Sequence, residues 1–255
     1  MAQESAAEGK YLYGIMRLGT PFNLGSRSVG EQGVPIYQIV VDDLAALVSD
    51  SPIVEYEGSR RNLMAHTRVL EEAMQYGTVL PVRFGIVAPS EDAVRRQLSG
   101  ARGDELRAAL DQMEGRVELG LKAFWYEDVI FGEVVNENSQ IRQLRDSLAG
   151  KSPEETYYER IRLGELIEGE LARRRGEDAA RIIERLRPLV EAVHEQPAIT
   201  DRMVVNAAFL IRRAAEPEID AAVNELDAEL GKRMMFKLVG PAPLYNFVSL
   251  KIGWS

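Results

Sequence analysis

The sequence predicts an α+β protein with two domains. Strand-like segments and long helical segments alternate irregularly, which favours α+β over the regular repeat of a doubly wound parallel sheet. The 255 residues, 45% of them hydrophobic, suffice for one large core or two modest ones. A new pattern starts at Arg116, so we place an N-terminal α+β domain at 1–114, a C-terminal domain at 115–241 and a tail at 242–255.

Apolar and β-branched segments predict strands in the first domain. After nine residues that are expected to be disordered, strands are expected at 11–16 and 36–41, with a Gly-, Ser- and Pro-containing loop between them. Residues 44–48 fit a short strand or a turn of helix, because so short a segment shows no decisive periodicity. Two short helices are expected to complete this domain, from about Ser90 and Asp104.

A longer helix and a further strand lie between these segments. Ser59 is a suitable N-cap for a helix that ends before Gly77. Residues 78–84 are expected to form a strand, in which Pro81 indicates an edge position or a bulge. The helix is expected to direct four side chains toward a core: Leu63, Thr67, Leu70 and Met74.

The second domain begins with an alternating strand pattern and continues with long helices. Ser152 marks a helix start, with Pro153 at the first helical position, and Gly176 is expected to end that helix. Pro188 should kink or split the next helix. The alternating apolar residues of the strand are Val117, Leu119, Leu121, Ala123 and Trp125.

The end of the chain supplies two more strands and an apolar tail. Strands are expected at 203–211 and 233–239, on either side of a helix that starts at Pro217. The order strand–helices–strand–helix–strand is compatible with a ferredoxin-like sandwich that carries a helical insertion. Residues 244–254 read as an extended segment too apolar to remain in water, so they should dock across both domains or onto a partner.

Composition excludes several classes of protein. The chain has no cysteine, which rules out disulfides, thiolate nucleophiles and cysteine-bound metals. The net charge of −9 argues against binding to nucleic acid, which requires clustered cations. The polar opening residues do not resemble a signal peptide, and no apolar stretch is long enough to cross a bilayer. We therefore expect an intracellular protein that binds neither nucleic acid nor a lipid membrane.

No constellation of catalytic, cofactor-binding or metal-binding residues stands out. His66 is expected to be a satisfied helix histidine and His194 a residue near a helix end, and their spacing does not suit zinc. The segment Gly25–Gly30 lacks the Gly-Lys-Ser/Thr end of a phosphate loop and the spacing of a dinucleotide fingerprint. The sequence therefore predicts no enzymatic activity, no cofactor and no metal.

Most charged clusters have ordinary structural explanations. The acidic pairs at 42–43 and 154–155 are expected at turns and at a helix start, and the acidic residue Asp50 at a turn. The run Arg173–Arg175 is expected in the last turn of a helix, where cations complement the helix dipole. Arg83 differs, because it lies between apolar neighbours in an expected strand. It must either reach a buried carboxylate or face an interface.

Several short motifs, in order along the chain, resemble those of the gas vesicle F/L protein family. The most recognisable is residues 80–85, Leu-Pro-Val-Arg-Phe-Gly, which matches the family's Leu-Pro-x-Arg-Phe-Gly box. Each motif is weak alone, but together they are specific and span nearly the whole chain. Departures at Ala242 and Leu244 leave the choice between F and L open. The other matching segments are Tyr11–Ile15, Arg60–Glu72, Gly164–Ile167, Asn206–Leu210 and Gly240–Val248.

The resemblance implies a non-catalytic accessory or minor structural protein of the gas vesicle. Family members have two α+β domains, the second a modified ferredoxin-like fold with extra helices, and a tail that helps bind the domains together. They associate with the major shell protein, GvpA, and with other vesicle accessory proteins. They are thought to limit shell-protein aggregation during nucleation, and some reside on the gas-facing surface.

The resemblance thus implies a location at the gas vesicle, inside the cell. The expected role is binding of shell protein during assembly. A structural subunit retained on the gas-facing surface is the alternative, and an unrecognised enzyme is a remote one. The candidate contacts with a partner or with the other domain are Arg83, Phe84, Tyr245, Phe247 and Trp254.

Overall fold

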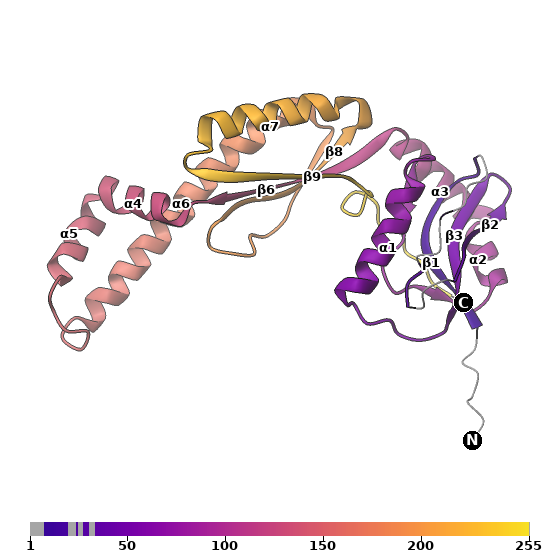
Figure 1. Cartoon of the computed structure of the whole chain (residues 1–255), viewed down its shortest axis with the longest axis horizontal. Coiled ribbons are helices and arrows are strands. Elements are labelled where there is room, and N and C mark those ends of the chain that lie inside the picture. Colours follow the sequence, from indigo (N-terminus) through magenta and orange to yellow (C-terminus); the bar gives the residue numbers. More distant parts are fainter. Residues whose placement is uncertain (1–7, 20–23, 25–27, 31–33, 255) are drawn as a thin grey trace, which may run out of the picture. The chain divides into compact units, whose positions relative to one another are not determined.

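The computed structural model describes residues 8–19, 24, 28–30 and 34–254 of the chain (Figure 1). Residues 1–7 and much of the loop at 20–35 fall outside them. Glu8 and Gly9, which were expected to be disordered with the residues before them, belong instead to strand β1. The chain forms two compact units, Met1–Glu118 with Pro241–Ser255, and Leu119–Gly240. The prediction of a mixed helix and sheet protein is confirmed. Among the described helices, none is both long and apolar enough to cross a membrane.

The first unit is built on a five-stranded sheet with β1 at its centre. The strands follow the order β2-β3-β1-β4, and β5 also pairs with β1. These strands pair antiparallel, and a bulge interrupts β1 between Leu12 and Gly14. Residues 44–48, for which the sequence allowed either a strand or a turn of helix, form part of strand β3. The strands are β1 Glu8–Arg17, β2 Ile36–Val41, β3 Leu44–Pro52, β4 Val79–Pro81 and β5 Val87–Ala88.

Three helices cover this sheet: α1 Arg60–Ala73, α2 Glu91–Gln97 and α3 Gly100–Met113. All three contact β1, which explains why β1 is buried along both faces. Ser59 and Ser90 cap α1 and α2 through their side-chain oxygens, as local sequence predicts. The helix expected from Asp104 begins earlier, at Gly100.

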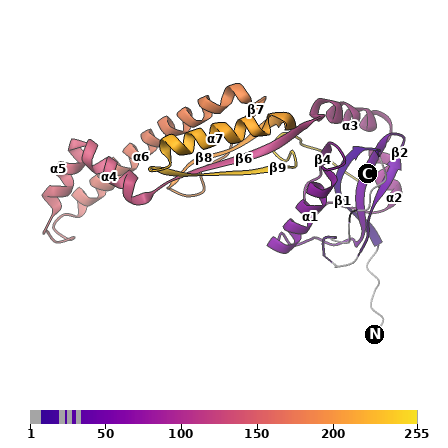
Figure 2. The same ribbon diagram turned by 45° about the horizontal axis from the view of Figure 1, so that its top comes forward.

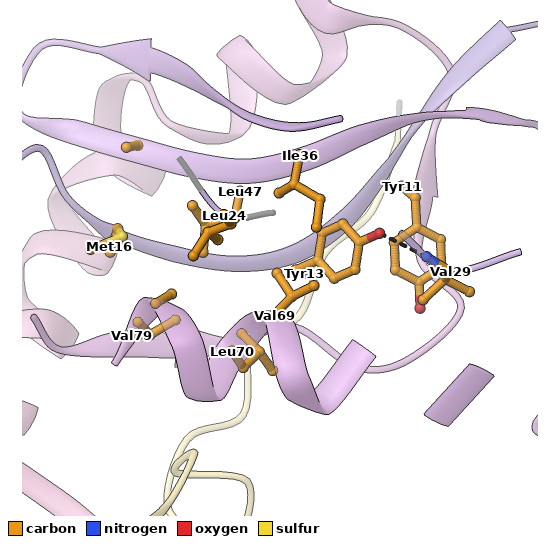
Figure 3. Packing of buried hydrophobic residues seen from close by; sticks show 12 residues of the cluster. Tyr11, Tyr13, Met16, Leu24, Val29, Ile36, Leu47, Val69, Leu70 and Val79 are labelled. Atoms are coloured by element: carbon orange, nitrogen blue, oxygen red, sulfur yellow. Dashed lines mark hydrogen bonds between the residues drawn. The ribbon is translucent and has the colours of Figure 1, made fainter. Parts of the chain in front are cut away.

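The core of the first unit joins β1 to α1. Figure 3 shows the ring of Tyr13 beside Val69 of α1 and the ring of Tyr11 near Val29. The backbone N–H of Val29 donates to the Tyr13 hydroxyl at 3.0 Å. Each tyrosine therefore buries an apolar ring while its hydroxyl keeps a hydrogen-bond partner.

The predicted core side of α1 is right in part. Leu70 is buried and Met74 packs against the core, but Thr67 is only half-buried and Leu63 is 44% exposed. The buried side consists of His66, Val69, Leu70 and Ala73, and Leu63 lies at its margin in the first turn of the helix. The prediction for Pro81 is confirmed, since β4 ends the strand order and pairs with β1 alone.

The second unit contains a four-stranded sheet in the order β7-β8-β6-β9. Its strands are β6 Arg116–Trp125, β7 Ala192–Glu195, β8 Met203–Arg212 and β9 Met234–Ala242. Its helices are α4 Glu127–Glu137, α5 Ser139–Leu148, α6 Tyr157–Leu186 and α7 Glu216–Leu230, with short 3₁₀ turns at Arg187–Leu189 and Arg213–Ala215.

Helices α6 and α7 lie on the same side of this sheet, while α4, α5 and the first half of α6 extend beyond it as an arm (Figure 2). The five alternating apolar residues predicted for β6 are all buried, and so are Ile219, Val223, Leu226 and Leu230 of α7. Alternation of period two and the helical stripe therefore identified both elements correctly.

Helix α6 contradicts two predictions. It begins at Tyr157 rather than just after Ser152, and it continues through Gly176 to Leu186. A glycine inside a helix costs only about 1 kcal/mol. Burial of Ile182, Ile183 and Leu186 beyond it outweighs that cost. Pro188 acts as expected, because the α-helix ends just before it.

His194 and the tail also differ from prediction. His194 is not at a helix end but on β7, where it pairs with Ala208 of β8. The tail is not a regular extended segment, since residues 245–247 form a turn, and Leu244 is its buried anchor at 2% exposure. The predicted docking of the tail across both domains stays a prediction.

Candidate interaction surface

Residues 80–85, which we call the box loop, comprise the end of β4 and the turn toward β5, so the strand expected at 78–84 is limited to Val79–Pro81. Its geometry depends on Tyr11 of β1 and His66 of α1. The Nε2–H of His66 donates to the carbonyl oxygen of Val82 at 3.1 Å. A carbonyl can only accept, so Nδ1 of His66 carries the lone pair that accepts from the Tyr11 hydroxyl at 3.0 Å. The same hydroxyl accepts the backbone N–H of Gly85 at 3.0 Å.

These groups are buried among aromatic rings. His66 is 2% exposed, and burial lowers its pKa to about 4, so the ring is neutral near pH 7. Burial also raises the pKa of Tyr11 well above its usual range. The ring of His66 stacks on Tyr13 at 5.5 Å between centroids and meets the edge of Phe84 at 5.9 Å. The prediction of a satisfied helix histidine is therefore confirmed, and the box loop is held at both ends.

Arg83 lies between these two fixed points and faces outward. It is exposed, and it has no charged or hydrogen-bonding partner within the part of the chain that the structure describes. Of the two explanations open from sequence, a buried carboxylate partner is therefore wrong. Phe84, beside it, is half-buried against the core of the first unit. The box loop thus presents a free guanidinium on a rigid base.

The start of the tail contacts α1 at Thr67, the residue that follows His66. The hydroxyl of Tyr245 is hydrogen-bonded to the side chain of Thr67, and burial raises the pKa of this tyrosine, although 41% of the residue remains exposed. Asn246 donates two hydrogen bonds to the carboxylate of Glu118. Its backbone N–H donates to Oε2 at 2.9 Å, and its side-chain Nδ2 donates to Oε1 at 2.6 Å. Glu118 is only 6% exposed, and these hydrogen bonds from the tail give its buried carboxylate the partners that it needs.

The rest of the tail lies elsewhere on the first unit. The carbonyl oxygens of Lys251 and Gly253 accept hydrogen bonds from Arg102 and Gln97, each at 2.7 Å. Trp254 therefore lies near α2 and α3 and is half-buried, as is Phe247. Of the five candidate contacts, Phe84 and Tyr245 contact neighbouring residues of α1, His66 and Thr67. Trp254 lies instead near α2 and α3.

The sequence missed a contributor to this surface. Leu63, assigned to the core by its spacing, is exposed one turn before Thr67, the residue that holds Tyr245. The only signal in the sequence was its position in the first turn of α1. We call Leu63, Arg83, Phe84 and Tyr245 the box-and-tail surface.

The arginine run of α6 serves a different purpose from the predicted one. It lies in the middle of the helix, not in its last turn. Arg174 is 8% exposed and forms ion pairs with Glu170 at 2.7 Å, Glu137 at 2.8 Å and Glu133 at 3.4 Å. Glu133 also pairs with Arg233 at 2.8 Å. The run therefore joins α4 to α6 and to the start of β9.

The remaining candidates for chemistry are accounted for by local contacts. Asp43 lies in the turn between β2 and β3 and pairs with Arg17 and Arg107, which lowers its pKa. Asp50, expected at a turn, is on β3, where it pairs with Lys10. Within the described residues, no three His, Asp or Glu side chains are grouped so that they would hold a metal ion. An open hollow of about 620 Å³ in the second unit is lined by Leu119, Arg213, Ala214, Glu216, Pro217, Asp220, Leu238 and Gly240.

Comparison with known proteins gives a consistent family. The family model described as gas vesicle synthesis protein GvpL/GvpF matches residues 9–249. Gas vesicle protein F of Dolichospermum flosaquae is 30% identical over 242 residues, covering 94% of this chain and 97% of that protein. Gas vesicle protein F of a Streptomyces strain is 33% identical over 242 residues, covering 93% and 98%.

Solved structures agree in fold. The crystal structure of GvpF from Anabaena superposes with a TM-score of 0.80 at 31% identity, covering 96% of this chain and 99% of that one. The crystal structure of GvpF from Microcystis aeruginosa superposes with a TM-score of 0.76 at 29% identity, covering 95% and 99%.

Proposed function

The chain belongs to the gas vesicle GvpL/GvpF family, and from this premise we propose that it binds the major shell protein of the GvpA type and assists vesicle nucleation and assembly. In this proposal it acts without catalysis, cofactor or metal, and it also contacts other vesicle accessory proteins. The single observation that carries the proposal is the box loop, which holds an exposed Arg83, without a partner among the described residues, on a buried Tyr11–His66 support.

Physical chemistry supports a role in covering shell protein. A shell that encloses gas needs subunits with a strongly apolar face, and such a face self-associates in water unless a partner covers it. The box-and-tail surface offers apolar area at Leu63, which is 44% exposed, and at Tyr245, which is 41% exposed, beside one free cation. Such a mixture suits a partner with an apolar face and a carboxylate at its rim.

The topology of the second unit supports its proposed assignment to a modified ferredoxin-like sandwich. The chain runs β6, helices, β7, β8, α7, β9, and the sheet order is β7-β8-β6-β9. With the strands numbered by sequence, this is the order 2-3-1-4 of a β-α-β-β-α-β fold. Helices α4 and α5 together with the first half of α6 are the proposed insertion.

The experiment is a pull-down of purified shell protein by the full chain. We expect Arg83→Glu to reduce capture strongly, because the variant places a like charge against the partner's carboxylate. Tyr245→Ala should reduce capture as well. Arg162→Glu is the matched control, since Arg162 is exposed on α6 and has no side-chain partner among the described residues. Equal capture by the Arg83 and Arg162 variants would refute the assignment of this surface.

A strain that lacks the chain tests the assembly role itself. We expect few or no vesicles, and restoration by the wild-type chain. Vesicles of normal number and size would contradict the proposed function, whatever the pull-down shows.

A second candidate is a structural subunit retained on the gas-facing surface of the finished vesicle. It is favoured by large apolar side chains that the second unit leaves open: Tyr157, Tyr158 and Ile199 are 60%, 81% and 72% exposed. Immunodetection on purified, stripped vesicles separates the two roles. A retained subunit remains in the vesicle fraction, whereas an assembly factor is found only in the supernatant.

A further inference from the structure

Helix α1 carries charges that its own stability does not explain. Arg60 and Arg61 occupy its first turn, where the helix dipole favours carboxylates and disfavours cations. The first turn has no acidic residue and the last turn no basic one. Helix α2 of the same unit shows the favourable arrangement, with Glu91 and Asp92 in its first turn and basic residues in its last.

These arginines share one face with an apolar side chain. The buried side of α1 is centred on His66, Val69, Leu70 and Ala73. At 100° per residue, the opposite side carries Arg60, Met64, Arg68 and Glu71, with Arg61 beside them. All five are exposed, and Met64 is 41% exposed. We call these five residues the outer face of α1. Leu63 and Thr67, which belong to the box-and-tail surface, lie to its side.

The cations of this face are unpaired. Arg60, Arg61 and Arg68 have no ion pair or side-chain hydrogen bond within the part of the chain that the structure describes. Several exposed arginines of other helices have carboxylate partners: Arg95 pairs with Glu91, Arg173 with Glu170, Arg181 with Glu229 and Arg185 with Glu225. Isolated exposed arginines without a side-chain partner among the described residues occur elsewhere, as at Arg162 of α6, but α1 gathers three of them on one side of a single helix.

We propose that the outer face of α1 docks an acidic amphipathic helix of a partner protein. Arg60 and Arg68 are eight residues apart, a spacing of about 12 Å along the helix axis, so they would meet carboxylates about two turns apart on the partner. Met64 lies between them, and its flexible, polarizable side chain adapts to apolar residues of different shape. A helix with carboxylates on either side of an apolar stripe matches both features.

Nucleic acid and anionic lipid fit this face less well. Both present continuous phosphates and reward many cations, whereas here three arginines surround an apolar centre and the exposed Glu71 lies on the same side of α1. The inference is independent of the shell protein's identity, because it specifies the chemistry of a helix and uses a face other than the box-and-tail surface.

The test measures binding of a fluorescent peptide by anisotropy. The probe is a helical peptide of about 18 residues, with leucines at spacings of three and four and glutamates beside them. Two matched probes carry glutamine or lysine in place of the glutamates. We expect the glutamate peptide to bind the full chain at least about tenfold more tightly than the glutamine peptide, and the lysine peptide not to bind.

Variants locate the binding. Arg60→Glu combined with Arg68→Glu should weaken binding of the glutamate peptide at least about tenfold. The control combines Arg162→Glu with Arg202→Glu, two exposed arginines of the second unit that have no side-chain partner among the described residues, and it should bind like the wild type. Arg60→Glu puts a carboxylate in the first turn of α1, which favours the helix, whereas Arg68→Glu adds a like charge near Glu71 and Glu72. Thermal unfolding of the double variant, and binding by the Arg60→Glu single variant, therefore show whether lost binding reflects unfolding.

Three results would overturn the proposal. One is failure of the glutamate peptide to bind, and another is equal binding to both double variants. The third is tighter binding to duplex DNA or to anionic vesicles than to the peptide, lost in the Arg60 and Arg68 variant, which would identify a phosphate-binding face instead. Neither the shell-protein pull-down nor the vesicle phenotype enters this readout, so the two proposals fail separately.

Discussion

The buried His66 makes the stability of the first unit depend on pH in a definite direction. His66 donates to Val82, accepts from Tyr11, and is 2% exposed, so the fold holds the neutral ring. Protonation would place a charge among Tyr13 and Phe84 and would turn the acceptor nitrogen toward Tyr11 into a donor. Acid should therefore destabilise this unit before carboxylates begin to titrate.

The magnitude follows from the two pKa values. Burial lowers the pKa of His66 from its ordinary 6.5 to about 4 in the folded chain. Between these values the unfolded chain binds a proton that the folded chain does not, so the free energy of unfolding falls as the pH falls. The contribution is fully present above about pH 6.5 and is lost progressively toward about pH 4. The total is about 3 kcal/mol, at about 1.4 kcal/mol per pH unit.

The assay is urea unfolding between pH 7.5 and 4 in a Trp125→Phe background. Trp254 is then the only tryptophan, and it lies in the tail that belongs to the first unit. The matched variant is His66→Gln, whose amide N–H can donate to Val82 while its oxygen accepts from Tyr11. We expect the parent to lose about 3 kcal/mol relative to the glutamine variant over this range.

The comparison cancels other titrations. Carboxylates such as Asp43 and Asp50 have pKa values lowered by their cationic partners, and they contribute equally to both proteins. Parallel pH profiles for the histidine and glutamine proteins would refute the reasoning. So would a difference that grows as the pH rises, because that would mean a protonated His66 in the fold.

Three further predictions concern packing and ion pairs, and each is measured as a change in the free energy of unfolding by urea. Arg174→Met should cost the second unit about 2–3 kcal/mol, because it removes the buried guanidinium that pairs with Glu170, Glu133 and Glu137. Arg173→Met, at an arginine whose side chain is 51% exposed, should cost under about 1 kcal/mol, and similar losses would contradict the role of burial. Gly14→Ala should cost about 1–3 kcal/mol, because its Cβ would lie 2.7 Å from Leu70 Cδ2 and 2.8 Å from Val79 Cγ1, while Gly120→Ala, with 3.9 Å to the nearest atom, should be nearly neutral. Ser59→Ala should cost about 1 kcal/mol by removing the cap on the Asn62 amide, and no change would mean that water replaces the cap.

Local pattern predicted most elements, because the forces that define them act over a few residues. The alternation from Val117 to Trp125 specified a strand, and Ser59 marked the start of α1 to the residue. The order of the box loop and the other motifs along the chain identified the family. Composition also made a disulfide or a cysteine-bound metal impossible.

Interactions between distant residues explain the failures. Gly176 reads as a helix end, yet α6 continues because Arg173 and Glu177 pair across it and Ile182 and Ile183 are buried beyond it. The run Arg173–Arg175 reads as a helix end as well, but Glu133 and Glu137 of α4 are its partners, some forty residues earlier in the chain. Spacing within one helix carries no information about which other helix packs against it.

The sequence by itself determined the family, the strand and helix types, and the absence of thiol chemistry, since each depends on residue identity or on short-range periodicity. Only the tertiary structure decided that His66 is neutral and that β8 lies beside β6. It also decided that Arg83 and the arginines on the outer face of α1 have no partner in the part of the chain that the structure describes. Burial, charge pairing and strand order arise where segments far apart in the chain meet. Their free energies therefore depend on the whole fold rather than on any one segment.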